Sequence, residues 1–460
     1  MPGKTSTSKR LIPKGKYSVA IISLGCAKNL VNSEQMMFSL AAAGYRLVSE
    51  PRGADAAVVN TCAFIGPAKQ EAIDTLLRLG ELKKAGALGR IIVAGCLAER
   101  YKDEIARELP EADGFVGVGA FGDVARAVTE ALRGGVYAAF PPPEECDDNL
   151  PRVVSTPRAW AYLKIADGCD NRCAFCAVPN IRGRYRSRRE EDILVEAEGL
   201  IASGARELIV IAQDTTRYGL DIYGERRLTR LLRRLSEIPG ARWIRLHYLY
   251  PDGVTEELIR EIAENEKLLK YLDIPIQHIN DGILKKMRRR GTGREVRELI
   301  ERVRLGIPGV VLRTSVITGL PGEGAREFDE LLGFLRDAKF ERAGVFPYSP
   351  EEGTEAFDMI CPDESVAKQR AEAVEELQSR VMDGFNASRV GKELEVLIEG
   401  REGGVLYGRS FAESPDIDGV VALRGNADPG AFARALITGA DGADAVGEII
   451  NTEETGAKAV

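Results

Sequence analysis

The sequence predicts an α/β protein made of an open parallel-sheet domain, a partial (βα)6 barrel and a small five-stranded β-barrel. Three observations lead to this prediction. Short apolar runs alternate with amphipathic helical segments through most of the 460 residues, which is the pattern of parallel strands covered by helices. A stiff, acidic, proline-rich stretch at 141–148 interrupts the alternation. After residue 390 the helices give way to short strands separated by Gly, Asp and Pro, as in barrels of the OB type.

The expected domains follow these changes in pattern. The N-terminal arm is basic and polar without an apolar core, which indicates a disordered segment and not a signal peptide. No apolar run is long enough for a membrane span, so we expect a cytoplasmic chain whose cysteines are reduced. The expected parts are a disordered basic arm at 1–16, a first domain at 17–140, a linker at 141–156, a second domain at 157–389 and a third at 390–460.

Three βα units are visible in the first domain, and a cysteine follows the strand of each. The carboxyl ends of parallel strands share one edge, where ligands bind, so we expect Cys26, Cys62 and Cys96 to converge there. The alternative is three buried cysteines that act as small apolar residues. The predicted strands are 18–22, 56–59 and 90–94, and the helices include 33–43 and 69–79.

Six strand candidates alternate with amphipathic helices in the second domain, which predicts a partial, open form of the eight-unit barrel. In such barrels the reactive groups lie on loops at the carboxyl ends of the strands. A long helix over 365–386 leads out of the domain. The strand candidates are 161–165, 207–211, 242–248, 271–276, 310–317 and 342–346.

The third domain is acidic. From Lys392 to the end it carries thirteen acidic and six basic side chains, a formal charge equal to the −7 of the whole chain. A nucleic-acid-binding module would be basic. An acidic module suits a basic partner, and solubility alone is the other interpretation. Its predicted strands are 394–398, 405–407, 420–423, 433–438 and 446–450.

A second set of cysteines, Cys169, Cys173 and Cys176, shares one short loop after the first strand of the second domain. Zinc would need a fourth ligand, and none lies within the next turn or two. A four-iron cluster accepts three thiolates and keeps one iron open. The loop therefore favours an iron–sulfur centre. Two further cysteines, Cys146 and Cys361, are interpreted as bystanders.

The run Cys169-x3-Cys173-x-Phe175-Cys176 resembles the signature of the radical S-adenosylmethionine (SAM) superfamily. The resemblance implies a [4Fe-4S] cluster whose open iron binds SAM, and a one-electron cleavage that releases a 5′-deoxyadenosyl radical. The superfamily's Gly-Gly-Glu contact to SAM is not visible, and Gln213 and Asp214 occupy the comparable place. The segment 317–322 resembles the SAM-binding glycine segment; a tight strand-to-helix turn is the alternative. The implied cofactor-binding residues are Phe175, Gln213, Asp214, Thr318 and Gly319.

Further motifs resemble the methylthiotransferase family of that superfamily, and the third domain is similar to its TRAM domain. The resemblance covers all of the chain except the N-terminal arm. It implies that Cys26, Cys62 and Cys96 hold an auxiliary [4Fe-4S] cluster that carries the inserted sulfur, and that a second SAM supplies the methyl group. The matching segments are 26–34, 60–62, 94–96, 163–169 and 182–188.

Two branches of the family compete. The RimO type modifies the β-carbon of an aspartate in small-subunit ribosomal protein twelve, and the MiaB type modifies a transfer-RNA adenosine. Segments 26–31, 164–171 and 211–216 look like the RimO type, although Asn32 stands where that type usually carries Asp. The acidic third domain favours a basic ribosomal protein, free or within the ribosome, and no direct transfer-RNA binding. A non-catalytic iron–sulfur carrier is a third hypothesis.

The RimO-type interpretation requires an electron donor, which is expected to be a reductase, a flavodoxin or a ferredoxin. It implies no interaction with a membrane.

The sequence does not decide whether several other polar residues line the pocket or have a structural role. The two histidines could line the pocket or be structural, and three arginines could bind the SAM carboxylate or the substrate aspartate. The basic run 285–290 could meet ribosomal RNA or face solvent. The residues in question are His247, His278, Arg182, Arg184 and Arg188.

Overall fold

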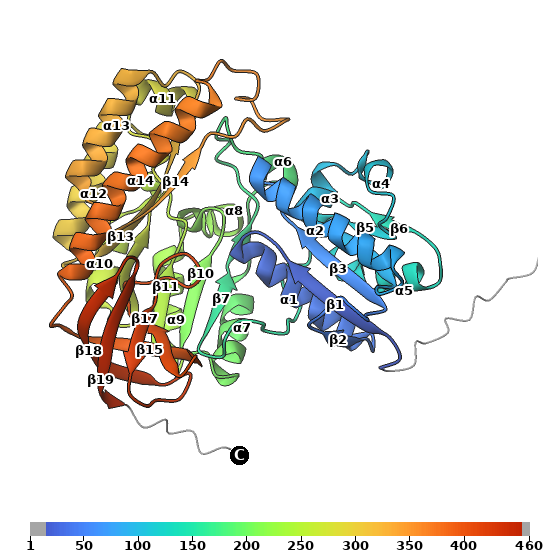
Figure 1. The fold of residues 1–460 in the computed structure, drawn as a ribbon. Coiled ribbons are helices and arrows are strands. Elements are labelled where there is room, and N and C mark those ends of the chain that lie inside the picture. The colour runs from blue at the N-terminus through green and yellow to red at the C-terminus, as the bar shows by residue number, and fades with distance from the viewer. Residues whose placement is uncertain (1–14, 453–460) are drawn as a thin grey trace, which may run out of the picture. The chain divides into compact units, whose positions relative to one another are not determined.

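The computed structural model describes residues 15–452 (Figure 1). Its contacts divide the chain into two compact units. The first unit joins the chain up to Ser155 to residues Asn180–Gly183, and the second contains residues Thr156–Pro179 and the chain from Arg184 onward. The arm expected to be disordered, residues 1–16, lies outside the described residues except for its last two positions. None of the described helices is long and apolar enough to cross a bilayer.

The first unit is built on a six-stranded, fully parallel sheet in the order β2-β1-β3-β4-β5-β6. The three predicted strands correspond to β1, β3 and β4. The sequence missed β2, β5 and β6, because each has three residues and so shows no periodicity. The strands are β1 Ser18–Ser23, β2 Arg46–Val48, β3 Ala56–Thr61, β4 Arg90–Gly95, β5 Gly114–Val116 and β6 Tyr137–Ala139, and the helices include α1 Ala27–Ala42, α2 Gly66–Lys84, α3 Cys96–Arg100 and α5 Val124–Leu132.

The second unit contains a second six-stranded parallel sheet, ordered β14-β13-β12-β11-β10-β7. Each strand pairs with its neighbour along the chain, and β7 and β14 remain as edges, so the sheet is the open (βα)6 barrel that the sequence predicts. The strands are β7 Trp160–Lys164, β10 Glu207–Ile211, β11 Trp243–Leu246, β12 Leu268–Asp273, β13 Val311–Thr318 and β14 Arg342–Pro347. The main helices are α7 Glu190–Ala202, α9 Leu228–Glu237, α10 Glu256–Glu264, α12 Gly293–Gly306, α13 Ala325–Ala338 and α14 Glu364–Ala387.

The chain ends in a closed five-stranded barrel with the order β15-β16-β17-β19-β18. Its interior is an apolar cluster that includes Val396, Leu406 and Ile437. Alternating inward and outward residues on β18 produce this core, as expected for a strand with one buried face. The strands are β15 Glu393–Glu402, β16 Val405–Arg409, β17 Val421–Arg424, β18 Phe432–Asp441 and β19 Asp444–Thr452.

The loop between β16 and β17 is bound to side chains of the six-stranded sheet within the second unit. Arg245 of β11 donates to the carbonyl oxygen of Phe411 at 2.8 Å. Nε2 of His247 lies 2.8 Å from Oγ of Ser414. Tyr271 of β12 donates from its hydroxyl to Asp418 at 2.7 Å. The small barrel is therefore joined to the sheet by buried, specific polar contacts.

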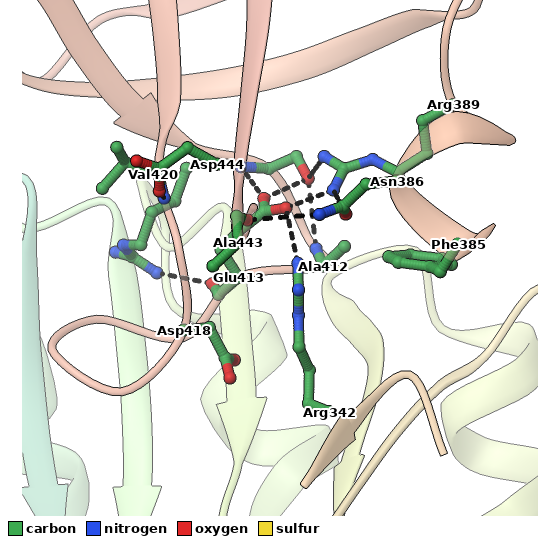
Figure 2. Close-up of polar contacts among 12 residues, drawn as sticks. Arg342, Phe385, Asn386, Arg389, Ala412, Glu413, Asp418, Val420, Ala443 and Asp444 are labelled. Carbon is green, nitrogen blue, oxygen red and sulfur yellow. Dashed lines mark hydrogen bonds and ion pairs between the residues drawn. The ribbon is translucent and has the colours of Figure 1, made fainter. Parts of the chain in front are cut away.

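Glu413 is the centre of a further buried contact (Figure 2). Its carboxylate is fully buried and accepts from Arg389, from Arg342 at 3.3 Å and from the hydroxyl of Ser410 at 2.6 Å. Burial raises the pKa of Glu413, but Arg389, Ser410 and Arg342 together lower it by more, so the pKa lies below its ordinary value. The carboxylate is thus ionised and matches the buried guanidinium groups.

A second buried carboxylate, Glu207 at the start of β10, joins the same two parts. Arg245 donates to one of its oxygens and Arg409 of β16 to the other, both at 2.6 Å. Arg409 also binds Glu399. The acidity of the third domain is therefore only partly a surface property, because Glu399 and Glu413 neutralise buried arginines. The acidic residues that stay exposed include Glu393, Glu402, Asp416, Asp428, Asp441 and Glu448.

Candidate active site

The cysteine loop of the second unit lies just after β7 and the short strand β8, Ala166–Asp167. Positive φ angles at Gly168 (74°) and Arg172 (50°) curl the chain tightly here. The backbone of Ala174 anchors the loop on both sides: its N–H donates to Met287 at 3.0 Å, and its carbonyl accepts from Ala356 at 2.8 Å. The three cysteines thus project from a loop that is tied to distant segments.

The electrostatics of this loop fit a cationic metal centre. Burial, together with the charges of Cys173 and Asp214, raises the pKa of Cys169 to about 11. Burial and Cys173 also raise the pKa of Cys176. Three neighbouring thiolates would repel one another unless a cation compensated them. The described residues contain no group of three ligands that could hold a single metal ion, and a four-iron cluster differs in that each thiolate binds its own iron.

Two side chains from outside the cysteine loop lie at the sulfur of Cys173. The hydroxyl of Tyr250 is 3.9 Å from Sγ, and Nη1 of Arg289 donates to Sγ at 3.8 Å. Burial raises the pKa of Tyr250, so the phenol stays protonated. The basic run 285–290 was expected either to meet RNA or to face solvent. Four of its five cations are exposed, but Arg289 turns inward.

Asp214 is held by contacts within the protein. It is fully buried, and its carboxylate accepts from Asn171 at 2.8 Å and from the backbone and hydroxyl of Thr216. Oδ1 of Asn171, the residue that binds Asp214, and Oε1 of the adjacent Gln213 are among the buried acceptor atoms of the described residues that have no hydrogen-bond partner. These oxygens fit the ammonium group of a ligand such as SAM, since a buried acceptor is costly when left unpaired.

Gln213 is oriented by the ion pair between Lys164 and Asp167, which the sequence did not predict. Its amide donates to Oδ1 of Asp167 at 2.6 Å. The other oxygen of Asp167 accepts from Lys164 at 3.0 Å, and both charged groups are fully buried. The two residues stand beside the first cysteine of the loop, in the segment 163–169, but nothing in their local pattern indicated that they pair.

The remaining predicted cofactor contacts lie near this loop or at the end of β13. Phe175 packs against an apolar cluster under the loop, which includes Ile283, Met287 and Leu320. Thr318 donates from its hydroxyl to Ala367 of α14 at 2.8 Å. Gly319 has a φ of 78°, and a side chain there would come within 2.3 Å of Ala367. This geometry is that of the tight strand-to-helix turn, and direct contact of Thr318 and Gly319 with SAM stays a prediction.

The histidines and two of the arginines have structural partners. His278 accepts from the backbone of Asn280 at 3.0 Å and lies 3.3 Å from Glu323. His247 holds the loop of the small barrel, as described above. Arg188 is buried, donates to the carbonyl of Lys164 at 2.7 Å and pairs with Glu196. Arg184 is exposed and lies 3.8 Å from Asp170.

The other three cysteines lie at the carboxyl edge of the sheet of the first unit. Cys26 precedes α1, Cys62 follows β3, and Cys96 begins α3 directly after β4. A side chain at Gly25 would come within 2.6 Å of Cβ of Cys62, so only glycine permits this approach. Asn29 links the segments: it donates to Leu24 and Thr61, and its Oδ1 lies 3.7 Å from Sγ of Cys96.

Arg182 completes this group of side chains from a distant part of the chain. It is nearly fully buried in the first unit and donates to Asn29 at 2.5 Å, to Asn32 at 3.2 Å and to Sγ of Cys96 at 3.8 Å. Crowding around its sulfur raises the pKa of Cys26, but Lys28 and Arg182 lower it by more. Burial, with the neighbouring thiol of Cys96, raises the pKa of Cys62 to about 12. The charges of Cys26, Cys96 and Arg182 all act on the thiol of Cys62, so the three thiols are close enough to influence one another.

Replacing Arg182 with Ala is expected to destabilise the first unit by about 1–3 kcal/mol, because two buried asparagine oxygens lose their donor. On the prediction that Cys26, Cys62 and Cys96 hold a cluster, we expect the iron content to fall as well. Urea unfolding and iron content after anaerobic reconstitution check both effects. Arg184→Ala, two residues away and exposed, is the matched control. Equal behaviour of the two variants would contradict the role given to Arg182.

The fold and the cysteine loop define the class of protein as a radical SAM enzyme. Residues 163–335 match the Radical SAM superfamily, 390–450 the TRAM domain, and 18–117 the family described as Uncharacterized protein family UPF0004. A solved structure of the radical SAM methyltransferase TsrM from Kitasatospora setae has a TM-score of 0.54 at 15% identity, covering 74% of this chain and 77% of that one. This similarity shows the fold alone.

Curated relatives identify the family. The chain is 46% identical to the ribosomal protein uS12 methylthiotransferase RimO of Thermoanaerobacter sp. over 94% of this chain and 99% of the relative. It is also 46% identical to the RimO protein of Geobacter sulfurreducens over 95% and 99%. The chain therefore belongs to the RimO family of radical SAM methylthiotransferases. The domain boundaries and the individual ligand residues stay predictions.

Proposed function

We propose that this protein methylthiolates the β-carbon of an aspartate in ribosomal protein uS12 and consumes two SAM molecules in each turnover. One observation carries the proposal. Each of two cysteine trios lies at the carboxyl edge of its own parallel sheet, in a chain that matches RimO proteins along almost their full length. Carboxyl edges of parallel strands are where such folds bind ligands.

Cys169, Cys173 and Cys176 would hold the radical [4Fe-4S] cluster, and Gln213 and Asn171 would face the ammonium group of SAM. When bound, this cluster supplies the electron that cleaves SAM. The protein fixes the positions of the two amide side chains. The amide nitrogen of Asn171 donates to Asp214 at 2.8 Å, and that of Gln213 donates to Asp167 at 2.6 Å. Because both amides are fixed through their nitrogen atoms, their oxygens remain directed to a cationic ligand.

Cys26, Cys62 and Cys96 would hold the auxiliary [4Fe-4S] cluster, which supplies the sulfur that is inserted. Asn29 and Arg182 would hold these thiols in position. Both contact the sulfur of Cys96, and Asn29 also donates to the carbonyl of Thr61, the residue before Cys62. The positive charges of Arg182 and Lys28 favour the thiolate form that iron binds.

The proposed protein substrate, taken free or within the ribosome, agrees with the exposed acidic side chains that remain on the small barrel after internal pairing. A basic ribosomal protein is attracted to such a surface, whereas a phosphate backbone is repelled. The proposed electron donor is a low-potential protein of the reductase, flavodoxin or ferredoxin class.

An anaerobic assay with reconstituted enzyme, SAM and a reductant tests the proposal. Purified uS12 and transfer RNA are offered in parallel and analysed by mass spectrometry, with a uS12 variant that lacks the target aspartate as the control. We expect methylthiolation of wild-type uS12 only. Modified transfer RNA together with unmodified uS12 would refute the proposed substrate.

A further inference from the structure

We propose that Arg289 and Tyr250 are positioning residues that hold the sulfur of Cys173 and raise the reduction potential of the radical cluster. The inference rests on the proposed function in one respect, that Cys169, Cys173 and Cys176 hold that cluster. Both side chains belong to the second unit but are remote from the cysteine loop in the sequence. Arg289 follows Cys173 by 116 residues.

The position of Arg289 is set by the way helix α11, Asp281–Lys286, ends. The N–H of Arg289 bonds to Leu284 at 2.8 Å and that of Arg288 to Lys285 at 3.1 Å, the paired bonds of a Schellman motif. Arg288 takes the left-handed position with φ of 52°, where glycine is the usual residue. The same helix end accepts the N–H of Ala174 at Met287. The cysteine loop and Arg289 therefore belong to one hydrogen-bonded piece of structure.

The guanidinium of Arg289 is held from three sides. It donates to the carbonyl of Pro275, it lies 4.1 Å above the ring centre of Tyr250, and it donates to Sγ of Cys173 at 3.8 Å. Arginine keeps its charge at every pH at which the protein is folded. A permanent positive charge is thus fixed against one of the three cluster ligands.

Tyr250 adds a second donor at the same sulfur. Its side chain is buried, and its hydroxyl accepts the N–H of Arg290 at 3.3 Å. Because the oxygen already accepts a hydrogen bond there, the hydroxyl proton of Tyr250 can be directed to Sγ of Cys173 at 3.9 Å. Among the described residues, the sulfur of Cys169 accepts instead from a backbone N–H, that of Asn171 at 3.5 Å, whereas Tyr250 and Arg289 both approach the sulfur of Cys173.

Reduction adds one electron, and so one negative charge, to the cluster, and no bond of the protein forms or breaks. A nearby cation and hydrogen bonds to a ligand sulfur stabilise the reduced form more than the oxidised form, which raises the potential. The electron comes from an external low-potential donor, dithionite in the test below. Arg289 and Tyr250 would therefore make the radical cluster easier for that donor to reduce.

The test is a potentiometric titration followed by electron paramagnetic resonance. The full-length chain carries Cys26→Ala, Cys62→Ala and Cys96→Ala, so that only the signal of the other cluster is followed. We expect Arg289→Gln to lower the midpoint potential by at least about 59 mV, a tenfold change in the one-electron equilibrium. Arg289→Lys, which keeps the charge but loses the planar fork, and Tyr250→Phe are expected to lower it less.

Two controls separate this effect from a general loss of charge or of structure. Arg288→Gly removes a cation one residue away that pairs with Glu355 at the surface and relaxes the left-handed residue without touching Cys173, and Arg294→Gln removes an exposed cation that pairs with Glu298 on α12. Both should keep the wild-type potential. An unchanged potential in Arg289→Gln with full iron content would overturn the inference and leave the proposed function intact. A wild-type chain with no SAM-sensitive cluster signal would overturn both.

Discussion

Cys173→Ala is expected to abolish the formation of deoxyadenosine from SAM, whereas Cys62→Ala should preserve cleavage and lose sulfur insertion. The reason is spatial. Cys173 belongs to the loop after β7 in the second unit, and Cys62 to the sheet edge of the first unit. A cluster with two thiolates is not held firmly enough to orient SAM. Reductive cleavage of SAM and methylthiolation of uS12 are measured separately by chromatography and mass spectrometry.

Cys361→Ala is the matched control for both variants. Cys361 is a half-buried cysteine that packs at the edge of the apolar cluster under the same loop. We expect both reactions to continue in this variant and iron content to remain that of the wild type. Equal loss of SAM cleavage in Cys173→Ala and Cys62→Ala would contradict the division of labour between the two trios.

Glu413→Ala is expected to destabilise the second unit by about 3–5 kcal/mol, because it leaves the buried guanidinium groups of Arg342 and Arg389 without a counter-charge (Figure 2). The chain provides its own reporters. Both tryptophans lie at this junction: Trp243 donates to Glu395 at 3.2 Å and packs on Phe432, and Trp160 lies beneath Arg409. Urea unfolding followed by tryptophan fluorescence therefore measures this part of the molecule.

The pH dependence of this stability follows from the lowered pKa of Glu413 and of Glu207, where Arg409 and Arg245 outweigh burial. A carboxyl group whose pKa is lower in the folded state stabilises the protein above its unfolded pKa of about 4.3. That contribution is lost as the pH falls through the folded value. We expect Glu413→Gln to reduce the dependence of the unfolding free energy on pH below this value.

Glu448→Ala, at an exposed position on β19 of the same barrel, is the control and should change stability by no more than about 0.5 kcal/mol. A loss of stability in Glu413→Ala as small as in Glu448→Ala would show that the buried ion pairs do not hold the small barrel to the sheet.

The repeating pattern of the chain was enough to predict most of its regular structure. The strand predicted at 207–211 is β10, and the helix predicted at 365–386 is α14 with one more residue at each end. Periodicity is a local property, since each strand or helix must bury one face whatever surrounds it. For the same reason the three-residue strands β2, β5 and β6 gave no signal.

The sequence alone also determined the placement of the two cysteine trios, because a residue just after a parallel strand lies at the carboxyl edge in every such sheet. Only the tertiary structure decided what surrounds them. Arg182 reaches Asn29 across 153 residues, and Arg289 reaches Cys173 across 116. It also decided that Glu413 faces inward to two arginines instead of a basic partner. Such contacts depend on how distant segments pack, and a charged side chain has the same local pattern whether it is paired in a core or exposed to water.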